Sequence, residues 1–508
     1  MKVSDVILFI SFVVILVYGY FKYKFNFWKS LGVPFIKPRI PYGNIQGKFS
    51  SHRRKLHSSQ VFSKFYTELK TQGSFGGIYF FTKPVMFVTG LDFLKTVLIK
   101  DFAYFHDRGM YYNAKDDPLS GHLLSIEGDY WKKLREKLTP TFTSGKMRQM
   151  MPTIVDVGVK LEAYMVKTIE NNPEPEIKDI LARFTTDIIG SCAFGIECNS
   201  LEDEKAKFLE MGLKVFQQPR NSFVKQLLAV TYPDFARKIG VKTTPDDVAE
   251  FFMNIVKDVV KYREENNIKR NDFMDLLLQL KNEGTLADET DNKKLGKLTV
   301  EEIAAQVFVF FLAGFETSST TMTFCLHELS LNHDIQDKAR SNVLEVLARH
   351  DGKITYEAIN EMTYLDQCIN ESLRKFPPGA SLIRTVTKDY IVPDTQIVLK
   401  KGMTMLASIY GIHHDPDIYP NPEEFDPDRF SHENTSKRHP MAFIPFGEGP
   451  RICIGMRFGI IETKVGLATL LSKFKFHKSD KTKIPLSFSK KNIVLSPEGG
   501  LYLRIEKI

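Results

Sequence analysis

The segment Phe446-Gly-Glu-Gly-Pro-Arg-Ile-Cys-Ile-Gly455 decides how this chain of 508 residues is interpreted. Three glycines and one proline surround a single cysteine, Cys453, and a helical pattern of apolar residues follows over 456–471. Glycine lets the backbone adopt unusual φ angles and approach a bulky flat object closely. Backbone N–H groups of such a loop, and the positive end of the following helix, stabilise a thiolate. The spacing F-x-x-G-x-x-x-C-x-G therefore predicts a cysteine bound axially to haem iron.

The composition excludes several classes of protein. The five cysteines are an odd number without a C-x-x-C pair, which argues against a disulfide scaffold or a zinc cluster and favours a reducing compartment. A net charge of +8 is too mild for a nucleic-acid binder, although it allows an acidic partner or an anionic membrane. We expect three cysteines in apolar helical patterns to be small core residues: Cys192, Cys325 and Cys368.

The uncharged stretch over 6–21, VILFISFVVILVYGYF, predicts a membrane anchor. A spanning helix needs about 17–25 residues, and the aromatic residue Tyr23 extends the stretch at its end. A cleaved signal would begin with a basic region and end at a small-x-small site, and neither is present. Basic residues follow over 22–39, so the rest of the chain is expected in the cytosol. We therefore predict an anchor over 1–24, a proline-rich hinge over 25–48 and a body over 49–508.

The body shows mainly helical periodicity. A capping box, Thr299-Val-Glu-Glu302, predicts a helix over 300–331 that is about 48 Å long. A similar start over 363–366 predicts a helix that ends before Pro377, because proline disfavours helix in the residue before it. The segments 78–81 and 85–89 flank Lys83-Pro84 as a predicted strand pair. The expected fold class is mainly α with small β-sheets, in one large domain.

Four further motifs, together with the cysteine loop, resemble the cytochrome P450 family in their order along the chain. The anchor and hinge resemble those of the microsomal members. The sequence segments 106–120, 138–147 and 445–451 are most similar to those of insect detoxification enzymes. The resemblance covers essentially the whole chain, and it implies the cytochrome P450 fold preceded by a transmembrane helix. The motifs are Trp131–Arg135 (W-x-x-x-R), Ala313–Thr317 (A-G-x-[D/E]-T), Glu371–Arg374 (E-x-x-R) and Pro427–Phe430, where Asp428 replaces the glutamate of P-E-R-F.

The resemblance implies haem b as cofactor, with Cys453 as the axial iron ligand and Phe446 packed beneath the ring. It also places Gly314 at the cofactor. Guanidinium groups suit carboxylates because their fixed donors match two oxygens. The residues that would hold the haem propionates are Arg451, Trp131, Arg135 and Arg384.

Two further groups of residues have different implied roles. Glu371 and Arg374 share a helix face at positions i and i+3, so they can pair, and with Arg429 they would form a structural charge triad. Thr317 can bond back to a carbonyl of its own helix, and the resulting kink would open a groove for oxygen. Thr317, ordered water and Glu316 would then form the proton relay of catalysis.

The substrate pocket and the partners follow from the resemblance alone. An apolar, aromatic-lined cavity suits lipophilic substrates. Electrons would come from NADPH through NADPH–cytochrome P450 reductase, in some members with cytochrome b5, and Lys132, Lys133, Lys137 and Arg457 would form a basic docking face. The residues expected to line the pocket are Tyr111, Leu123, Phe308, Phe311, Leu382 and Val494.

The predicted function is a haem-thiolate monooxygenase of the endoplasmic reticulum membrane that oxidises xenobiotics such as plant toxins and insecticides. Oxidation of an endogenous insect hormone or lipid would need the same chemistry with a narrower pocket. The cysteine loop would also suit a haem-thiolate isomerase, or a non-catalytic haem sensor or carrier. The intact pair Glu316-Thr317 argues against the isomerase, and the relay and the anchor argue against the sensor.

Overall fold

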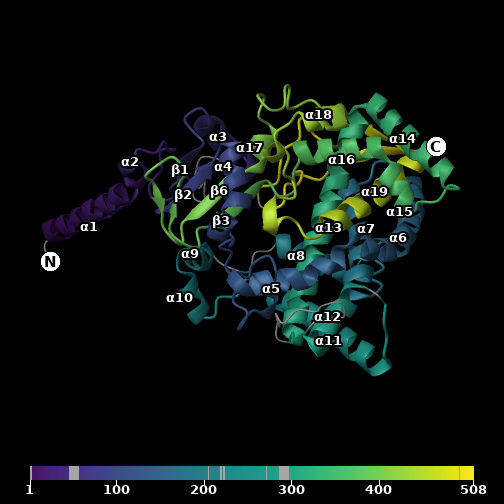
Figure 1. Ribbon diagram of the computed structural model, residues 1–508, viewed down its shortest axis with the longest axis horizontal. Helices are drawn as coiled ribbons and strands as arrows, with labels where there is room; N and C mark the ends of the chain where they lie inside the picture. The colour runs from purple at the N-terminus through teal and green to yellow at the C-terminus, as the bar shows by residue number, and fades with distance from the viewer. Residues whose placement is uncertain are drawn as a thin grey trace. The chain divides into compact units, whose positions relative to one another are not determined.

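The computed structural model describes residues 3–44, 56–203, 205–217, 220, 223–270, 272–284, 297–490 and 492–508. Residues 45–48 of the predicted hinge and 49–55 of the predicted body lie outside the described residues. The described elements are mainly helices with small sheets, which confirms the predicted fold class (Figure 1). The chain forms two compact units. Unit 1 contains Met1–Gly109, Ala380–Pro422 and Arg438–Ile452; unit 2 contains Met110–Gly379, Glu423–Lys437 and Cys453–Ile508.

Unit 1 is built around a four-stranded sheet of order β1-β2-β6-β3. The pairs β1–β2 and β3–β6 are antiparallel, β2–β6 is parallel, and the buried side chains of the sheet form the core of the unit. The strands are β1 (Phe75–Phe80), β2 (Lys83–Val88), β3 (Ser381–Thr385), β4 (Tyr390–Ile391), β5 (Val398–Leu399) and β6 (Thr404–Ser408), and the helices are α1 (Val3–Lys24), α2 (Phe27–Ser30), α3 (Ser58–Lys70), α4 (Leu91–Lys95), η1 (Thr96–Lys100), η2 (Phe102–Tyr104), α17 (Ile409–His413), η7 (Pro440–Ala442) and η8 (Gly449–Arg451).

The predicted strand pair in unit 1 is confirmed, but its turn is displaced. Lys83 and Pro84 belong to β2 rather than to the turn, and Pro84 lies opposite Tyr79. The chain reverses at Phe81, whose φ is 53°. Pro84 has no N–H to donate, but the pairing of β2 with β6 begins only at Val85. The proline therefore removes no hydrogen bond between β2 and β6.

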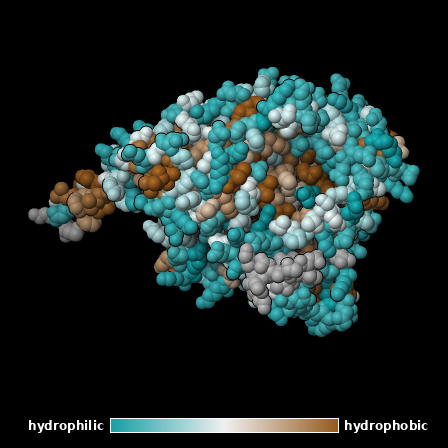
Figure 2. All heavy atoms as spheres, viewed as in Figure 1, coloured by the Kyte–Doolittle hydropathy of each residue, from teal (hydrophilic) through white to brown (hydrophobic). Residues whose placement is uncertain are grey.

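Helix α1 has no buried residue and extends away from the sheet of unit 1 (Figure 1). Figure 2 shows its apolar side chains exposed. Two described helices are long and apolar enough to cross a membrane, α1 and α13 (Val300–Leu331). They differ in burial, because 72% of the apolar window of α13 is buried and none of that of α1 is. The structure therefore supports α1 as a candidate anchor and α13 as a core helix.

Unit 2 is mainly helical, and α13 lies at its centre against α7 and α19. The antiparallel strands β7 and β8 pair from Phe474 to Lys478. The helices are η3 (Pro118–Ser120), α5 (Gly128–Leu138), η4 (Thr139–Phe142), α6 (Ser144–Asn171), α7 (Ile177–Ile189), η5 (Gly190–Phe194), α8 (Lys207–Gln217), α9 (Phe223–Thr231), α10 (Pro233–Lys238), α11 (Asp246–Asn266), α12 (Phe273–Glu283), α13, α14 (His333–Arg349), α15 (Tyr356–Glu361), α16 (Thr363–Lys375), η6 (Pro427–Phe430), α18 (His432–Ser436) and α19 (Met456–Lys473), and the strands are β7 (Phe474–Lys478) and β8 (Leu503–Lys507).

The ends of the predicted helices of unit 2 follow local signals. Helix α13 starts at the predicted capping box: Glu302 N–H donates to the Thr299 hydroxyl at 3.1 Å, and Thr299 N–H donates to the Glu302 carboxylate at 2.8 Å. Helix α16 ends before Pro377 as predicted, but the cap predicted at its start is wrong. Its N-cap residue is Met362, whose side chain makes no capping bond. Asn342 of α14 caps the helix instead, because its Oδ1 accepts from the N–H groups of Tyr364 at 3.2 Å and Leu365 at 3.4 Å.

Candidate functional site

The loop before α19 has the backbone that its glycines predict. Gly447 and Gly449 have φ angles of +73° and +75°, which favour glycine. A Cβ atom at Gly449 would lie 2.0 Å from the carbonyl oxygen of Leu98, so a larger residue does not fit there. Cys453 lies three positions before Met456, where α19 begins, and the positive end of that helix favours a thiolate.

Cys453 differs from the other four cysteines in its accessibility. It is exposed, whereas Cys192, Cys325 and Cys368 are buried, which confirms their prediction as core residues. Burial raises the pKa of each of these three thiols and of Cys198, so these four cysteines are poor sources of a thiolate. The exposed thiol at the start of α19 is therefore the candidate metal ligand.

Helix α5 places two predicted site residues one turn apart in the same unit as Cys453. Trp131 is buried and Arg135 is half-buried. Burial lowers the pKa of Arg135, while the negative charge that Cys453 can carry raises it. The guanidinium of Arg135 thus lies within electrostatic range of the sulfur, on the helix where W-x-x-x-R predicts it.

In unit 1, β3 buries Arg384 to 1% exposure. Its Nη1 donates to the carbonyl oxygen of Ile383 at 2.9 Å, and its Nε has no hydrogen-bond partner among the described residues. Burial and, secondly, the positive charge of Arg108 lower the pKa of Arg384 to about 9. The sequence did not predict Arg108 as a site residue. Nothing in its local pattern shows that it lies near Arg384 of β3, which is 276 residues further along the chain.

Arg451 joins the same cluster of unit 1. Its Nε donates to the carbonyl oxygen of His106 at 2.8 Å, and Nη2 of Arg108 donates to the carbonyl oxygen of Arg451 at 3.2 Å. The Asp107 carboxylate, 3.6 Å from Arg451 Nη2, balances part of the charge. Phe446 lies in this unit as well, at the start of the loop.

These residues fit the predicted cofactor. The positive charges of neighbouring guanidinium groups repel each other, so a bound anion would stabilise them. Nε of Arg384, which has no hydrogen-bond partner among the described residues, could donate to such an anion. The two propionates of a haem would supply such anions. An accessible cysteine before a helix N-terminus would supply the axial sulfur. Within unit 1, Arg108, Arg384 and Arg451 would therefore suit the propionates, and within unit 2 Cys453 would suit the iron.

One face of α13 is accessible within an otherwise buried stretch. Phe310, Ala313, Gly314 and Thr317 are partly or fully exposed, and their spacing of three and four residues places them on one face. The hydroxyl of Thr317 donates to the carbonyl oxygen of Ala313, which is the predicted back-bond. Helix α13 is nevertheless continuous from Val300 to Leu331, so the kink remains a prediction.

Gly314 also has a packing role. A Cβ atom there would lie 2.3 Å from Cδ1 of Ile189, so the glycine lets α13 pack closely against the end of α7. This close packing accounts for a glycine at position 314 whether or not a cofactor is bound. It does not test the prediction that Gly314 lies at the haem.

Glu316 is buried and makes an ion pair that the sequence did not indicate. Its Oε1 lies 2.6 Å from Nζ of Lys178 on α7, and its Oε2 has no hydrogen-bond partner among the described residues. The adjacent residues Glu316 and Thr317 thus have different partners. A relay through both would use the second oxygen of Glu316.

The predicted charge triad is assembled within unit 2. Glu371 and Arg374 are both 0% exposed. They form two parallel hydrogen bonds, from Arg374 Nε to Oε2 at 2.7 Å and from Arg374 Nη2 to Oε1 at 2.8 Å. Arg429 of η6 approaches Glu371 Oε1 to 3.4 Å. The triad also fixes backbone, because Asp426 N–H donates to Glu371 and Arg374 donates to the carbonyl oxygen of Glu424.

The residues predicted to line the pocket are divided between the units. Leu382 is in unit 1, and the others are in unit 2. Phe311 is fully buried and stacks on Phe315, with a ring separation of 5.0 Å, so it packs within an aromatic cluster. Phe308 packs on Phe252 of the same cluster. Leu123 is also buried, while Tyr111, Leu382 and Val494 are half-buried, and their role as pocket walls remains a prediction.

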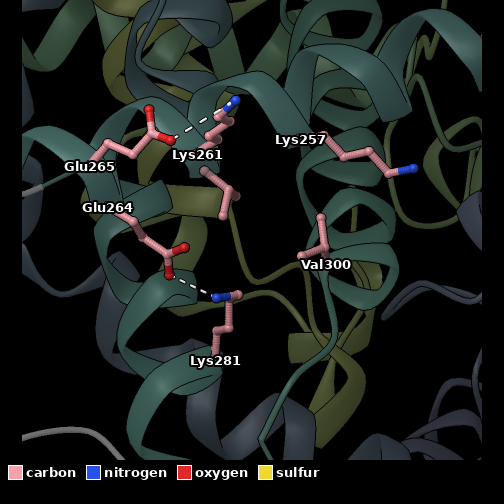
Figure 3. Close-up of a pocket in the computed structure, with 7 residues that line it drawn as sticks. Lys257, Lys261, Glu264, Glu265, Lys281 and Val300 are labelled. Carbon is pink, nitrogen blue, oxygen red and sulfur yellow. Dashed lines mark hydrogen bonds and ion pairs between the residues drawn. The ribbon is translucent and has the colours of Figure 1, made fainter.

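A separate surface depression of 290 Å³ lies between α11, α12 and the start of α13 (Figure 3). Two ion pairs at its rim, Lys281–Glu264 at 2.7 Å and Lys261–Glu265 at 3.9 Å, satisfy most of its charges. Val300 in its wall is 17 residues from Thr317, or about 25 Å along the helix axis. This depression is therefore not part of the site around Thr317.

Comparison with known proteins identifies the family of the chain. The family model of cytochrome P450 matches residues 42–504. The chain is 48% identical to probable cytochrome P450 6a14 of Drosophila melanogaster, over 95% of this chain and 96% of that protein. It is 45% identical to cytochrome P450 6A1 of Musca domestica, over 96% of this chain and 95% of that protein. The chain therefore belongs to the cytochrome P450 family, whose cofactor is haem iron, and is a cytochrome P450 monooxygenase.

Proposed function

We propose that this monooxygenase oxidises lipophilic xenobiotics, such as plant toxins and insecticides, with electrons from NADPH. The observation that carries the proposal is the accessible thiol of Cys453 at the start of α19, within a chain similar over almost its whole length to insect cytochromes P450. The accessible face of α13 is apolar at Phe310, Ala313 and Gly314, which suits an apolar substrate.

The bound haem would supply an iron at which oxygen is activated. Cys453 would hold it as a thiolate, and the proposed partners of its propionates are Trp131, Arg135, Arg384 and Arg451. Thr317 would hold and pass protons through its hydroxyl, whose hydrogen bond to Ala313 fixes its rotamer. Glu316 would supply those protons through Oε2, because Lys178 holds Oε1.

NADPH–cytochrome P450 reductase is the proposed electron donor, with cytochrome b5 as a second partner. Lys132, Lys133 and Arg457 are exposed in unit 2 and can attract an acidic surface. Lys137 is 5% exposed, so its prediction as a docking residue is wrong. It lies three residues after the buried Leu134 and so shares the buried face of α5.

We propose that α1 anchors the protein in the endoplasmic reticulum membrane with both units in the cytosol. Deletion of residues 3–24 should move the protein from carbonate-washed membranes to the soluble fraction, because α1 is the described spanning candidate with no buried residue. The haem spectrum of the truncated protein should be unchanged. Retention in the washed membranes would show that another segment holds the protein there.

Thr317→Ala should raise the share of NADPH electrons recovered as hydrogen peroxide about tenfold or more, since proton transfer by a positioned side chain contributes roughly 10²–10⁴-fold. Thr317→Ser retains the hydroxyl and is the matched control. Peroxide and product are measured per NADPH consumed. Unchanged coupling in the alanine variant would remove Thr317 from the relay.

Arg384→Met should affect the haem-free and haem-loaded proteins in opposite directions. Without haem, a buried arginine whose pKa is lowered to about 9 destabilises the fold at neutral pH, so its removal should stabilise the protein by about 1–4 kcal/mol. With haem, the lost propionate partner should speed haem transfer to an acceptor protein. Thermal denaturation of both forms checks this, with the exposed Arg39→Met as control. A haem-loaded variant that retains haem as well as wild type would contradict the assignment.

The substrate class is tested by product formation with the reductase, NADPH and a panel of plant toxins, insecticides and insect hormones. Oxidation of several unrelated xenobiotics would support the proposal. Turnover of one hormone alone would replace it with a biosynthetic role. Absence of turnover, despite a normal spectrum of the carbon monoxide complex, would contradict both.

A further inference from the structure

Glu462 is a buried carboxyl group that has no part in the roles described above. It lies on α19, is 0% exposed, and neither of its carboxyl oxygens has a hydrogen-bond partner among the described residues. Burial raises the pKa of Glu462 well above its usual value, and the hydroxyl of Ser318 on α13 acts in the opposite direction. Burial without a compensating cation favours the neutral form of a carboxyl group. The surroundings of Glu462 therefore favour its neutral form.

Ser318 lies on the side of α13 that faces α19. Its Oγ is 3.7 Å from the position that a Cβ atom would take at Gly459, so Ser318 packs directly against α19. Gly459 and Glu462 are one turn apart on the same face of α19. Ser318 is itself buried. The serine and the carboxyl group thus share the interface between the two helices.

Ser318 and Glu316 flank Thr317 along α13. Successive residues of a helix are rotated by about 100°, so the two flanking side chains leave the helix on opposite sides of Thr317. On one side Lys178 of α7 holds Glu316 at 2.6 Å, and on the other side Ser318 is buried at the interface with α19 to which Glu462 also belongs. Polar residues of two other helices, Lys178 and Glu462, therefore lie beside α13 on the two sides of the residue that carries the hydroxyl.

We propose that Glu462, as a neutral carboxylic acid, is a positioning residue that sets the rotation of α13, and hence the direction of the Thr317 hydroxyl, through Ser318. The inference rests on the function proposed above for Thr317. A neutral carboxyl group can both donate to and accept from a hydroxyl, whereas a carboxylate only accepts. The neutral form also places no charge beside the relay.

The first test measures the carboxyl group directly, without catalysis. Infrared spectra of the haem-loaded wild type and Glu462→Gln should differ by one carbonyl stretching band of a protonated carboxylic acid. The same band should shift in Ser318→Ala, because the hydroxyl that faces the acid is removed. Absence of the band from the wild type would show an ionised Glu462 and overturn the proposal, and a band that Ser318→Ala does not shift would also overturn it.

The second test measures hydrogen peroxide per NADPH in Glu462→Leu, Glu462→Gln, Ser318→Ala and the double variant Glu462→Leu/Ser318→Ala. Removal of the proposed contact between Glu462 and Ser318 should raise peroxide about fivefold in Glu462→Leu, the order expected for one hydrogen bond between neutral groups. Glu462→Gln should remain near the wild type, because an amide both donates and accepts. The double variant should show no more than the effect of one single variant, since both changes remove the same contact.

Thr469→Val is the matched control, because it also replaces a buried polar residue of α19, where it lies beside Gly158 of α6. It should leave the peroxide yield at the wild-type level. A merely structural Glu462 predicts instead that the leucine variant changes thermal stability but not coupling, and that result would overturn the proposal. Thr317→Ala with wild-type coupling would refute the relay, while the infrared comparison would still decide whether the neutral acid contacts Ser318.

Discussion

Cys453→Ala should abolish the thiolate-type spectrum of the carbon monoxide complex and all NADPH-dependent product formation. The four other cysteines cannot replace Cys453 as the ligand, because burial raises the pKa of each of their thiols. Among the five cysteines, Cys453 is the exposed residue. A thiolate ligand donates electron density to haem iron and favours O–O cleavage, which alanine cannot do. Turnover should therefore fall to the background of a preparation without the enzyme.

Cys325→Ala is the matched control for this prediction. Cys325 is fully buried in α13, so its replacement should cost about 1 kcal/mol of stability through the small cavity that it leaves, with the spectrum retained. Spectra are recorded on dithionite-reduced protein at equal haem concentration. A thiolate-type spectrum in Cys453→Ala would assign the ligand to another cysteine.

The parts of the molecule that the sequence predicted well depend on local signals. The capping box fixed the start of α13 because both of its hydrogen bonds join residues within one turn, Thr299 and Glu302. The glycines around Cys453 mark a backbone that few other residues can adopt. Glu371 and Arg374 are close in sequence, so helix geometry alone brings them together.

The contacts that the sequence did not predict join distant segments. Lys178 pairs with Glu316 across 138 residues, and Arg108 lies close enough to Arg384 for their positive charges to interact. No local pattern in the sequence shows either interaction. The burial of Lys137 is different, because helical spacing from Leu134 places it on the buried face and could have shown it. The pocket walls are the hardest part to predict, since a phenylalanine pattern alone does not distinguish a cavity wall from a packed aromatic cluster.

Arg374→Ala should destabilise unit 2 by about 3–5 kcal/mol and yield protein with little stably bound haem, because it leaves the carboxylate of Glu371 buried without its main partner. It also removes the hydrogen bond to the carbonyl oxygen of Glu424, which precedes η6. Arg429 remains 3.4 Å from Glu371 and offsets part of the loss. Haem content per protein and the midpoint of thermal denaturation measure the effect.

The size of this effect distinguishes an uncompensated charge from a lost contact. Arg429→Ala should be milder, because Arg374 and the backbone N–H of Asp426 still hold the Glu371 carboxylate. The double variant Glu371→Leu/Arg374→Met should be more stable than Arg374→Ala alone, since replacing both members of a buried pair by apolar side chains removes the unpaired charge. Arg504→Ala, on the exposed edge of β8, controls for the loss of an arginine. Equal stability of Arg374→Ala and Arg504→Ala, with full haem content in both, would show that the triad does not hold this unit together.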